Sequence, residues 1–312
     1  MKDSRPLAIL LMGPTASGKT DLAMALHQRL GAELISVDSA MVYRGMDIGT
    51  AKPSPDEQAR APHRLIDIRD PADPYSAAEF RDDARLEMQR ISNDGGIPLL
   101  VGGTMLYYRS LLGGVGNLPA ADAATRAELE AWAAREGLGA LHAKLARVDP
   151  ESASRIHPND PQRLMRALEV QRLSQRPMSE LWREQRKETF AWQTLSIGLA
   201  PMHRSILHER IARRFEQMLE QGFVEEVAAL KARHDLHLGL PAMKSVGYRQ
   251  VWQYLEGVHG RDELAYKGIV ATRQLAKRQL TWLRRWPALH WIDPHGPDAV
   301  ENVLKIVRQC ST

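Results

Sequence analysis

The stretch LLMGPTASGKTDLA, residues 10–23, decides the fold of this chain. It contains Gly13, four further residues and then Gly18, Lys19 and Thr20, which is the spacing of a phosphate-binding loop, or P-loop. The apolar run LAILLM leads into the loop, and leucines recur at helical spacing after it. Strand, loop and helix in this order are the context that the motif requires, so the sequence predicts a phosphate site here.

The loop predicts an anion site built from backbone and side-chain groups. Backbone N–H groups at the start of a helix attract anions, Lys19 adds a positive charge, and the Thr20 hydroxyl suits Mg²⁺. The alternative is a tight turn with a structural lysine. The predicted phosphate-binding residues are Gly13, Pro14, Thr15, Ala16, Ser17, Gly18, Lys19 and Thr20.

Apolar runs alternate with helical patterns along the chain. The runs AELISVDS, HRLIDI, IPLLVGGT and LSIGLA predict further strands, and SAAEFRDDARLEMQRISNDG predicts a helix between two of them. This alternation favours an α/β fold with a parallel sheet core of the P-loop NTPase type, flanked by helices. Long helices are expected over 203–221 and 262–286, and a short one at the C-terminal end.

Residues 118–194 predict a separate helical insertion domain. From about residue 120 the sequence is helical in pattern with few β-branched residues, and the Gly-rich stretch LLGGVGNLP precedes it. We therefore expect residues 1–117 and 195–312 to form the catalytic core. In the insertion, Asp160 followed by Pro161 predicts a helix start.

Composition sets the class of protein. The chain has 312 residues, is 44% hydrophobic and carries a net charge of +4. No apolar run approaches the roughly 20 residues that a membrane helix needs. The single cysteine, Cys310, excludes an intrachain disulfide and a cysteine-rich metal site. We expect a cytoplasmic protein, monomeric, with no membrane partner.

Two polar residues follow predicted strands that should lie near the P-loop. Asp38 ends AELISVDS, and Thr104 ends IPLLVGGT. Ligands of open α/β sheets bind beyond the carboxyl ends of the strands, so both should border the phosphate site. Asp38 is then a metal ligand or a general base. The alternative is that it caps the helix that follows it.

A basic segment near the C-terminal end predicts a phosphate-backbone surface. Between residues 264 and 292 there are six Lys or Arg and no acid. On a helical projection, Leu264, Leu275, Leu280, Trp282, Leu283 and Trp286 fall on one half, so the tryptophans are predicted to belong to the core. An acid-free basic half favours RNA contact over a merely solvated face. That half carries Lys267, Arg273, Lys277, Arg278, Arg284 and Arg285.

A second arginine cluster lies on the helix expected over 203–221. Arg210, Arg213 and Arg214 share one face at i, i+3 and i+4, and guanidinium groups suit a pyrophosphate. The sequence leaves open which of the three binds it. The predicted buried stripe of the helix is Leu207, Ile211, Phe215 and Met218.

Seven motifs in order resemble the bacterial tRNA dimethylallyltransferase (tRNA isopentenyltransferase) family. They are GPTASGKTDLA, ISVDSAMVYRGMDIGTAKP, DPYSAAEF, VGGTMLYYRSLLGG, DPQRLMRALEV, RIARRFEQML and KSVGYRQ, and the resemblance runs from about residue 8 to 290. It implies transfer of a dimethylallyl group from dimethylallyl diphosphate to N6 of the adenosine 3′ to the anticodon (tRNA position 37), with release of diphosphate. The partners implied are dimethylallyl diphosphate and the anticodon stem-loop of tRNA.

The resemblance also implies residue roles. Asp38 corresponds to the family's general base, Lys19 and Arg214 to groups that neutralise the leaving diphosphate, and Thr104 to a catalytic residue at the flipped nucleotide. The implied cofactor is Mg²⁺ on Thr20. The implied tRNA contacts are Asp38, Ser39, Ala40, Met41, Thr104, Arg126, Gln162, Arg163, Leu164, Met165, Arg166, Met243, Lys244, Ser245, Val246, Gly247, Tyr248, Ala276, Lys277, Arg278, Gln279, Leu280, Thr281, Trp282 and Leu283.

Two other classes of function compete with the transferase. A P-loop small-molecule kinase would share the loop and the carboxylate at the sheet edge, but it does not need the helical insertion or the basic helix. A non-catalytic RNA-binding protein would explain the basic helices but not the loop.

Overall fold

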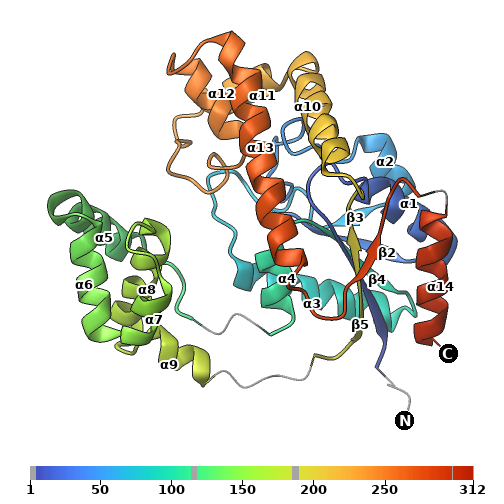
Figure 1. Cartoon of the computed structure of the whole chain (residues 1–312), viewed down its shortest axis with the longest axis horizontal. Coiled ribbons are helices and arrows are strands. Elements are labelled where there is room, and N and C mark those ends of the chain that lie inside the picture. Colours follow the sequence, from blue (N-terminus) through green and yellow to red (C-terminus); the bar gives the residue numbers. More distant parts are fainter. Residues whose placement is uncertain (1–4, 114–117, 185–189, 297, 312) are drawn as a thin grey trace. The chain divides into compact units, whose positions relative to one another are not determined.

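A six-stranded parallel sheet lies at the centre of the larger part of the chain (Figure 1). The computed structural model describes residues 5–113, 118–184, 190–296 and 298–311. The strand order is β3-β2-β4-β1-β5-β6. The strands are β1 (Leu7–Met12), β2 (Glu33–Val37), β3 (His63–Arg64), β4 (Pro98–Gly102), β5 (Gln193–Leu199) and β6 (His290–Ile292). The α/β parallel fold predicted from the alternating pattern is confirmed.

The edges of the sheet differ from the sequence prediction. Only the first two residues of HRLIDI pair with the sheet, as β3, because Leu65 and Asp67 adopt φ angles of +63° and +58° and turn the chain away. The short edge strand β6 was not predicted. It pairs with β5 from Ile197 to Leu199.

Helices cover both faces of the sheet. Near the N-terminal and C-terminal ends, α1 and α14 pack together, and Leu22 and Leu26 of α1 share a buried core with Val303 and Leu304 of α14. The helices of this part are α1 (Lys19–Leu30), α2 (Pro55–Arg60), α3 (Ala77–Asn93), α4 (Met105–Leu111), α10 (Arg204–Glu220), α11 (Phe223–Lys231), α12 (Tyr248–Leu255), α13 (Arg261–Leu283) and α14 (Ala299–Ser311). The long helices expected over 203–221 and 262–286 are α10 and α13.

Helices α10 and α13 pack closely because one position is glycine. The predicted stripe of α10 is buried, and Phe215 of that stripe lies against Gly268 of α13. A Cβ atom at position 268 would lie 1.9 Å from the Phe215 ring, so no larger residue fits there. This contact fixes the spacing of two helices that line the site described below.

The insertion forms a unit with its own core. The chain divides into two compact units, one made of Met1–Leu111 with Phe190–Thr312 and the other of Leu112–Thr189. The predicted boundaries of the insertion, 118 and 194, each lie a few residues after the ends of this unit at 112 and 189. Residues 193 and 194 belong to β5. The helices of the insertion are α5 (Ala123–Glu136), α6 (Leu138–Val148), α7 (Pro150–Arg155), α8 (Pro161–Ser174) and α9 (Met178–Arg183). Asp160 caps α8, as predicted, by accepting a hydrogen bond from Arg163 N at 3.1 Å.

The helices described here are too short or too polar to cross a membrane.

Candidate active site

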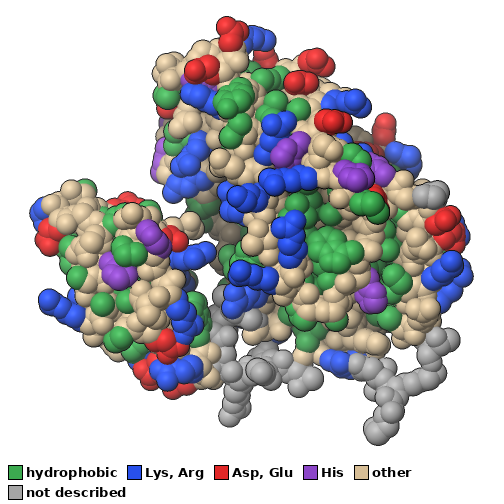
Figure 2. Space-filling model, viewed as in Figure 1, with side chains coloured by type: hydrophobic (Ala, Val, Ile, Leu, Met, Phe, Trp, Pro, Cys, Tyr) green, Lys and Arg blue, Asp and Glu red, His purple; other side chains and the backbone are tan. Residues whose placement is uncertain are grey.

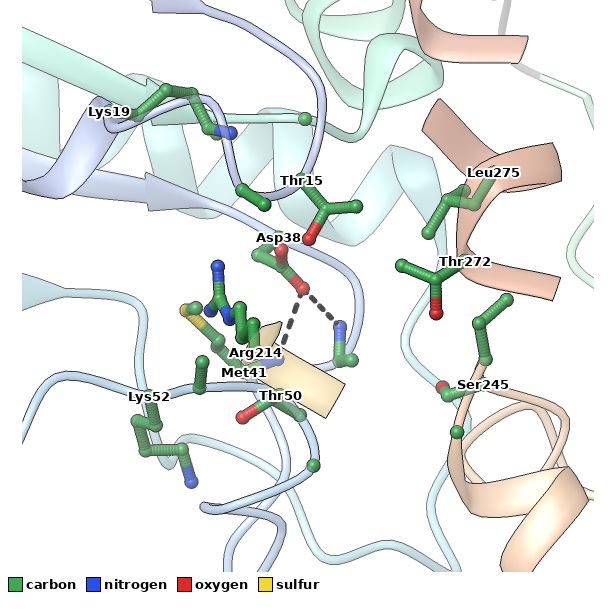
Figure 3. A pocket seen from close by; sticks show the side chains of 18 of the residues that line it. Thr15, Lys19, Asp38, Met41, Thr50, Lys52, Arg214, Ser245, Thr272 and Leu275 are labelled. Carbon is green, nitrogen blue, oxygen red and sulfur yellow. Dashed lines mark hydrogen bonds between the residues drawn. The ribbon is translucent and has the colours of Figure 1, made fainter. Parts of the chain in front are cut away.

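A cavity of about 1280 Å³ opens beyond the carboxyl ends of β1, β2 and β4. The P-loop, Asp38 and Thr104 line it from the sheet side, and residues of α10 and α13 line it from the helix side. Figure 3 shows Thr15, Lys19, Asp38 and Arg214 around this space, with Thr272 and Leu275 of α13 on another wall. Asp38 and Thr104 therefore border the same cavity as the P-loop, as their positions after predicted strands indicated.

The P-loop keeps a conformation that leaves the start of α1 open to a ligand. Gly18, the N-cap of α1, has φ +85°, and Ala16 has φ +62°. Left-handed backbone at a non-glycine residue costs energy and is concentrated at ligand-binding loops. Gly13 is required because the backbone of β5 lies close to it: a Cβ atom at position 13 would lie 2.6 Å from the Leu199 carbonyl oxygen.

Two side chains from the helical wall hold the loop from outside. Gln279 of α13 accepts a hydrogen bond from Thr15 N at 3.0 Å. Arg210 of α10 donates from Nε to the Ala16 carbonyl oxygen at 2.9 Å. The strained backbone at Ala16 is thus fixed by a contact that lies 194 residues away in the sequence.

The Lys19 ammonium lies in a positive environment. Its Nζ donates to the Pro14 carbonyl oxygen at 2.7 Å. Burial and the charge of Arg214 lower the pKa of Lys19 to about 7, while the nearby Asp38 charge opposes the shift. Burial also lowers the pKa of Arg214, again against the charge of Asp38. Two cations held this close to each other and to one carboxylate are suited to receive a multiply charged anion.

The three arginines of α10 separate into different roles. Arg210 donates to the Ala16 carbonyl oxygen, and its Nη1 atom lies 3.5 Å from Nε2 of His295. Arg213 is exposed at the edge of the cavity. Arg214 is the member whose charge interacts with those of Lys19 and Asp38, and it also lines the cavity.

Asp38 closes a turn and keeps one carboxylate oxygen available. Its Oδ1 accepts hydrogen bonds from Ala40 N at 2.9 Å and Met41 N at 3.3 Å. Residues 39–54 form turns and loops rather than a helix, so the helix-cap alternative is wrong, although the residue does cap a turn. Within the described ranges Oδ2 has no hydrogen-bond partner, and Asp38 lines the cavity.

Thr104 lies beside this turn. Its Oγ1 accepts from Ser39 N at 3.0 Å, and its own N–H donates to the Val37 carbonyl oxygen at 3.2 Å. The ends of β2 and β4 are therefore joined directly. Asp38 and Thr104, predicted from two separate motifs, border one side of the cavity.

Glu226 of α11 fixes another wall, residues 47–53. Its carboxylate accepts hydrogen bonds from the backbone N–H groups of Asp47 at 2.9 Å, Ile48 at 2.7 Å and Gly49 at 3.2 Å. The Tyr248 hydroxyl donates to the same group at 2.5 Å, and burial raises the pKa of that hydroxyl well above its usual range. No motif spacing pointed to Glu226, because its backbone partners in this wall lie 177 to 179 residues away.

In the insertion, one buried acid holds two of the predicted tRNA contacts. Glu169 is fully buried. It accepts from Arg126 Nε at 2.8 Å, Arg166 Nη1 at 2.6 Å and Asp122 N at 2.9 Å. Burial alone would raise the pKa of Glu169, but these hydrogen bonds lower it below its usual value. The sequence signal for this arrangement is the position of Glu169 within the apolar stripe of α8, because a buried acid is almost always paired with a cation.

Several predicted tRNA contacts have buried side chains. A buried side chain is not presented to RNA, so at these positions only the backbone is available for the predicted contact, which stays a prediction. They are Leu164, Met243, Tyr248, Ala276 and Leu283, with Gly247 also buried. By contrast, the exposed members of these segments include Gln162, Arg163, Lys244, Lys277, Arg278, Thr281 and Trp282.

Trp282 is exposed, so its assignment to the core was wrong. It is 38% exposed, lines the cavity, and has the Arg109 guanidinium 5.8 Å from its ring centroid. The helical projection failed because α13 ends at Leu283 and its last turn borders the cavity rather than the interior. Trp286, beyond the helix, is half-buried and lies edge-on to Tyr108 at 6.2 Å.

The basic half of α13 is divided. Lys and Arg side chains follow α13 on the face seen in Figure 2. Of the predicted basic half, Lys277, Arg278, Arg284 and Arg285 are exposed. Arg273 instead turns toward α10 and lies 3.5 Å from the His208 carbonyl oxygen, so it belongs to the helix contact rather than to the open surface.

Comparisons with known proteins agree on one family. The family model described as IPP transferase matches residues 41–286. A tRNA dimethylallyltransferase of Chromohalobacter salexigens is 64% identical over 312 residues, covering all of both chains. The crystal structure of a tRNA isopentenylpyrophosphate transferase of Bacillus halodurans is 36% identical, with a TM-score of 0.71 over 98% of this chain and 97% of that one.

A more distant structure shares the fold. A eukaryotic dimethylallyltransferase, described in a study of its action on tRNA, superposes with a TM-score of 0.82 over 97% of this chain and 79% of its own, at 23% identity. At that identity the likeness establishes the fold only. With the full-length match at 64% identity and the family match over most of the chain, this protein belongs to the IPP transferase family, the tRNA dimethylallyltransferases.

Proposed function

We propose that the protein transfers a dimethylallyl group from dimethylallyl diphosphate to N6 of the adenosine 3′ to the anticodon, at tRNA position 37, and releases diphosphate. The observation that carries the proposal is the convergence of a phosphate-binding loop and an available carboxylate on one cavity. The loop supplies an anion site, and Asp38 supplies a base within the same space.

The donor end of the site is built to stabilise a leaving diphosphate. The N–H groups at the start of α1, the Lys19 ammonium and the Arg214 guanidinium can all contact phosphate oxygens. As the allylic C–O bond breaks, its electron pair passes to the diphosphate. These fixed donors stabilise that charge most strongly as it develops, which lowers the barrier.

The acceptor end must activate a weak nucleophile. The lone pair of an exocyclic adenine amine is delocalised into the ring, so a base is needed to take its proton as the N–C bond forms. The Oδ2 atom of Asp38 is suited to that task, while Oδ1 is fixed by the turn. General base catalysis of this kind contributes typically about 10²–10⁴-fold. Thr104, beside the same turn, is positioned for contact with the nucleotide.

The residues present fit a Mg²⁺ ion bound mainly through substrate. Mg²⁺ takes oxygen ligands, retains several waters and often binds through substrate phosphates with few protein groups. The described residues hold no cluster of three metal-ligating side chains, and Thr20 lines the cavity at the start of α1. Thr20 would hold the ion, which supplies positive charge to the diphosphate.

RNA binding is assigned to the exposed basic residues. Lys277 and Arg278 are exposed on α13, and Arg278 also lines the cavity. In the insertion, Arg126 and Arg163 are side chains with 48% and 70% exposure. The adenosine must leave the anticodon-loop stack to enter the cavity, as bases do in base-flipping enzymes.

One assay tests the proposal against its rivals. The protein is incubated with unmodified tRNA, Mg²⁺ and radiolabelled dimethylallyl diphosphate, and label in RNA is counted. We expect incorporation that Lys19→Ala abolishes. Consumption of ATP with a small acceptor would favour the kinase, and RNA binding without label transfer would favour the non-catalytic protein.

A further inference from the structure

The amide of Gln279 makes two hydrogen bonds in opposite directions. Its Oε1 accepts from Thr15 N at 3.0 Å, and its Nε2 donates to the Gly103 carbonyl oxygen at 2.9 Å. Both partners are backbone groups, one in the P-loop and one at the end of β4. A single side chain of α13 therefore ties the loop to the strand end that carries Thr104.

The surroundings of this amide are specific for glutamine. A Cβ atom at Gly103 would lie 2.3 Å from the Gln279 Nε2 atom, so glycine leaves the room that the amide occupies. A primary amide presents an acceptor and a donor on the same rigid group. Glutamate lacks the donor for Gly103, and leucine has neither atom.

Gln279 does not share the role of its exposed neighbours. Lys277 and Arg278 are exposed on α13, whereas Gln279 is half-buried with both of its polar atoms bound to backbone. These two bonds use one lone pair of Oε1 and one N–H of Nε2, so the amide is held by backbone on both sides. Through them Gln279 acts on the loop and on the strand end.

We propose that Gln279 is a positioning residue, whose amide holds the donor-binding loop and the acceptor-binding strand end in one register. The P-loop fixes the allylic carbon through the diphosphate, and the segment from Gly103 to Thr104 borders the entering base. Reacting atoms must meet at about 3–3.5 Å, and a misplacement of about 1 Å can cost about 100-fold in rate. The tie determines that distance.

The inference rests on the proposed prenyl transfer, and the two can fail separately. Label transfer by the wild-type protein tests the function. The ratio of variant to wild-type turnover tests Gln279.

Gln279→Leu removes both hydrogen bonds and nearly keeps the side-chain volume. We expect kcat to fall about 10- to 100-fold. Affinities for pyrophosphate and for tRNA, measured by calorimetry and filter binding, should stay within about threefold of wild type, because no ligand contact is lost. Gln274→Leu is the matched control, since Gln274 is an exposed glutamine of the same helix outside the cavity. It should leave kcat unchanged.

Gly103→Ala tests the same tie from its other end. The added methyl group would lie 2.3 Å from the Gln279 Nε2 atom and 3.0 Å from the Gly13 carbonyl oxygen, so the amide is displaced first and most, and the variant tests the tie even if Gln279→Leu does not fold. We expect a similar loss of kcat, and a double variant with Gln279→Leu no worse than the stronger single one. An unchanged kcat in the folded single variants would overturn the inference. A loss of pyrophosphate or tRNA affinity matching the loss of rate would do so as well.

Discussion

Glu169 and Arg126 form an ion pair in which the carboxylate is fully buried and the guanidinium reaches solvent, with 2.8 Å between Oε1 and Nε. The same carboxylate holds Arg166. A flexible arginine becomes a fixed donor when one side of its guanidinium is already bound, so the proposed contact of RNA with the other side would cost less entropy. Glu169 thus fixes Arg126 with about half of its side chain exposed, whereas Arg166 is held on both sides, by Glu169 and by the Pro119 carbonyl oxygen.

Glu169→Gln should weaken RNA binding without affecting the donor. The amide cannot accept from both arginines with the strength of a carboxylate, and a hydrogen bond to a charged group contributes about 1.5–3 kcal/mol, so partial loss should raise the KM for tRNA about fivefold or more. The KM for dimethylallyl diphosphate should not change. Glu128→Gln, on an exposed acid that pairs with Arg172, is the control. Equal tRNA KM values in both variants would contradict the role of Glu169.

Asp38→Asn should abolish most turnover while binding persists. Asparagine can still accept from Ala40 N and keep the turn, but it cannot take a proton from the adenine amine. We expect kcat to fall by at least about 100-fold. Single-turnover kinetics with saturating tRNA measure it, and Asp56→Asn, on an exposed acid outside the cavity, serves as control. Turnover near wild type would remove Asp38 as the base.

Binding of pyrophosphate should take up a proton at Lys19. The pKa of Lys19 is about 7 in the free protein, so at pH 8 the amine is mainly neutral. A bound anion favours the charged form and raises this pKa, so the complex holds more protons than the free protein and affinity falls as pH rises above about 7. Calorimetry at pH 8 in buffers of different ionisation enthalpy measures the uptake.

Lys19→Met provides the comparison, because it lacks the amine and retains the proton equilibria of pyrophosphate itself. The difference in proton uptake between the two proteins belongs to Lys19. Identical proton counts would show that the lysine is already charged before the ligand arrives.

The exposed basic residues of α13 should govern the salt dependence of RNA binding. Each phosphate contact with a single strand contributes a slope of about 0.7 to the plot of log affinity against log salt. Changing Lys277 and Arg278 together to Ala should lower the slope by about one to two units, with donor affinity unchanged. Arg60 and Lys305, both exposed and outside the cavity, give a control double variant of equal net charge. A slope unaltered in the α13 variant would exclude this helix from the RNA surface.

Glu226→Gln should loosen the wall formed by residues 47–53. The carboxylate accepts four hydrogen bonds, from three backbone N–H groups and the Tyr248 hydroxyl, and the amide would turn a donor toward some of them. Hydrogen exchange at residues 47–49 should accelerate by at least about tenfold. Glu225→Gln, one residue away on the same helix, should not change it. Slow exchange retained in the Glu226 variant would contradict this role.

Local sequence patterns predicted the parts of the site that are local in the chain. The P-loop lies within eight residues, and Asp38 and Thr104 follow apolar runs, so the rule that ligands bind beyond the carboxyl ends of parallel strands placed both near the loop. The supporting contacts from the helices were not predictable in this way. Gln279 meets Thr15 across 264 positions, and Glu226 meets Ile48 across 178. Such pairs depend on how helices pack on the sheet, which no motif spacing records.

The lowered pKa of Lys19 also has a consequence for side reactions. A neutral amine is a nucleophile, and in this cavity it lies beside an alkylating agent that is meant for the RNA. An amine that stayed neutral would compete for the dimethylallyl group and inactivate the protein by self-alkylation. On the proton uptake predicted above, the diphosphate that delivers the electrophile would also restore the proton to Lys19, and an ammonium has no lone pair to attack with. Binding of the donor would thus protect Lys19 from alkylation by that same donor.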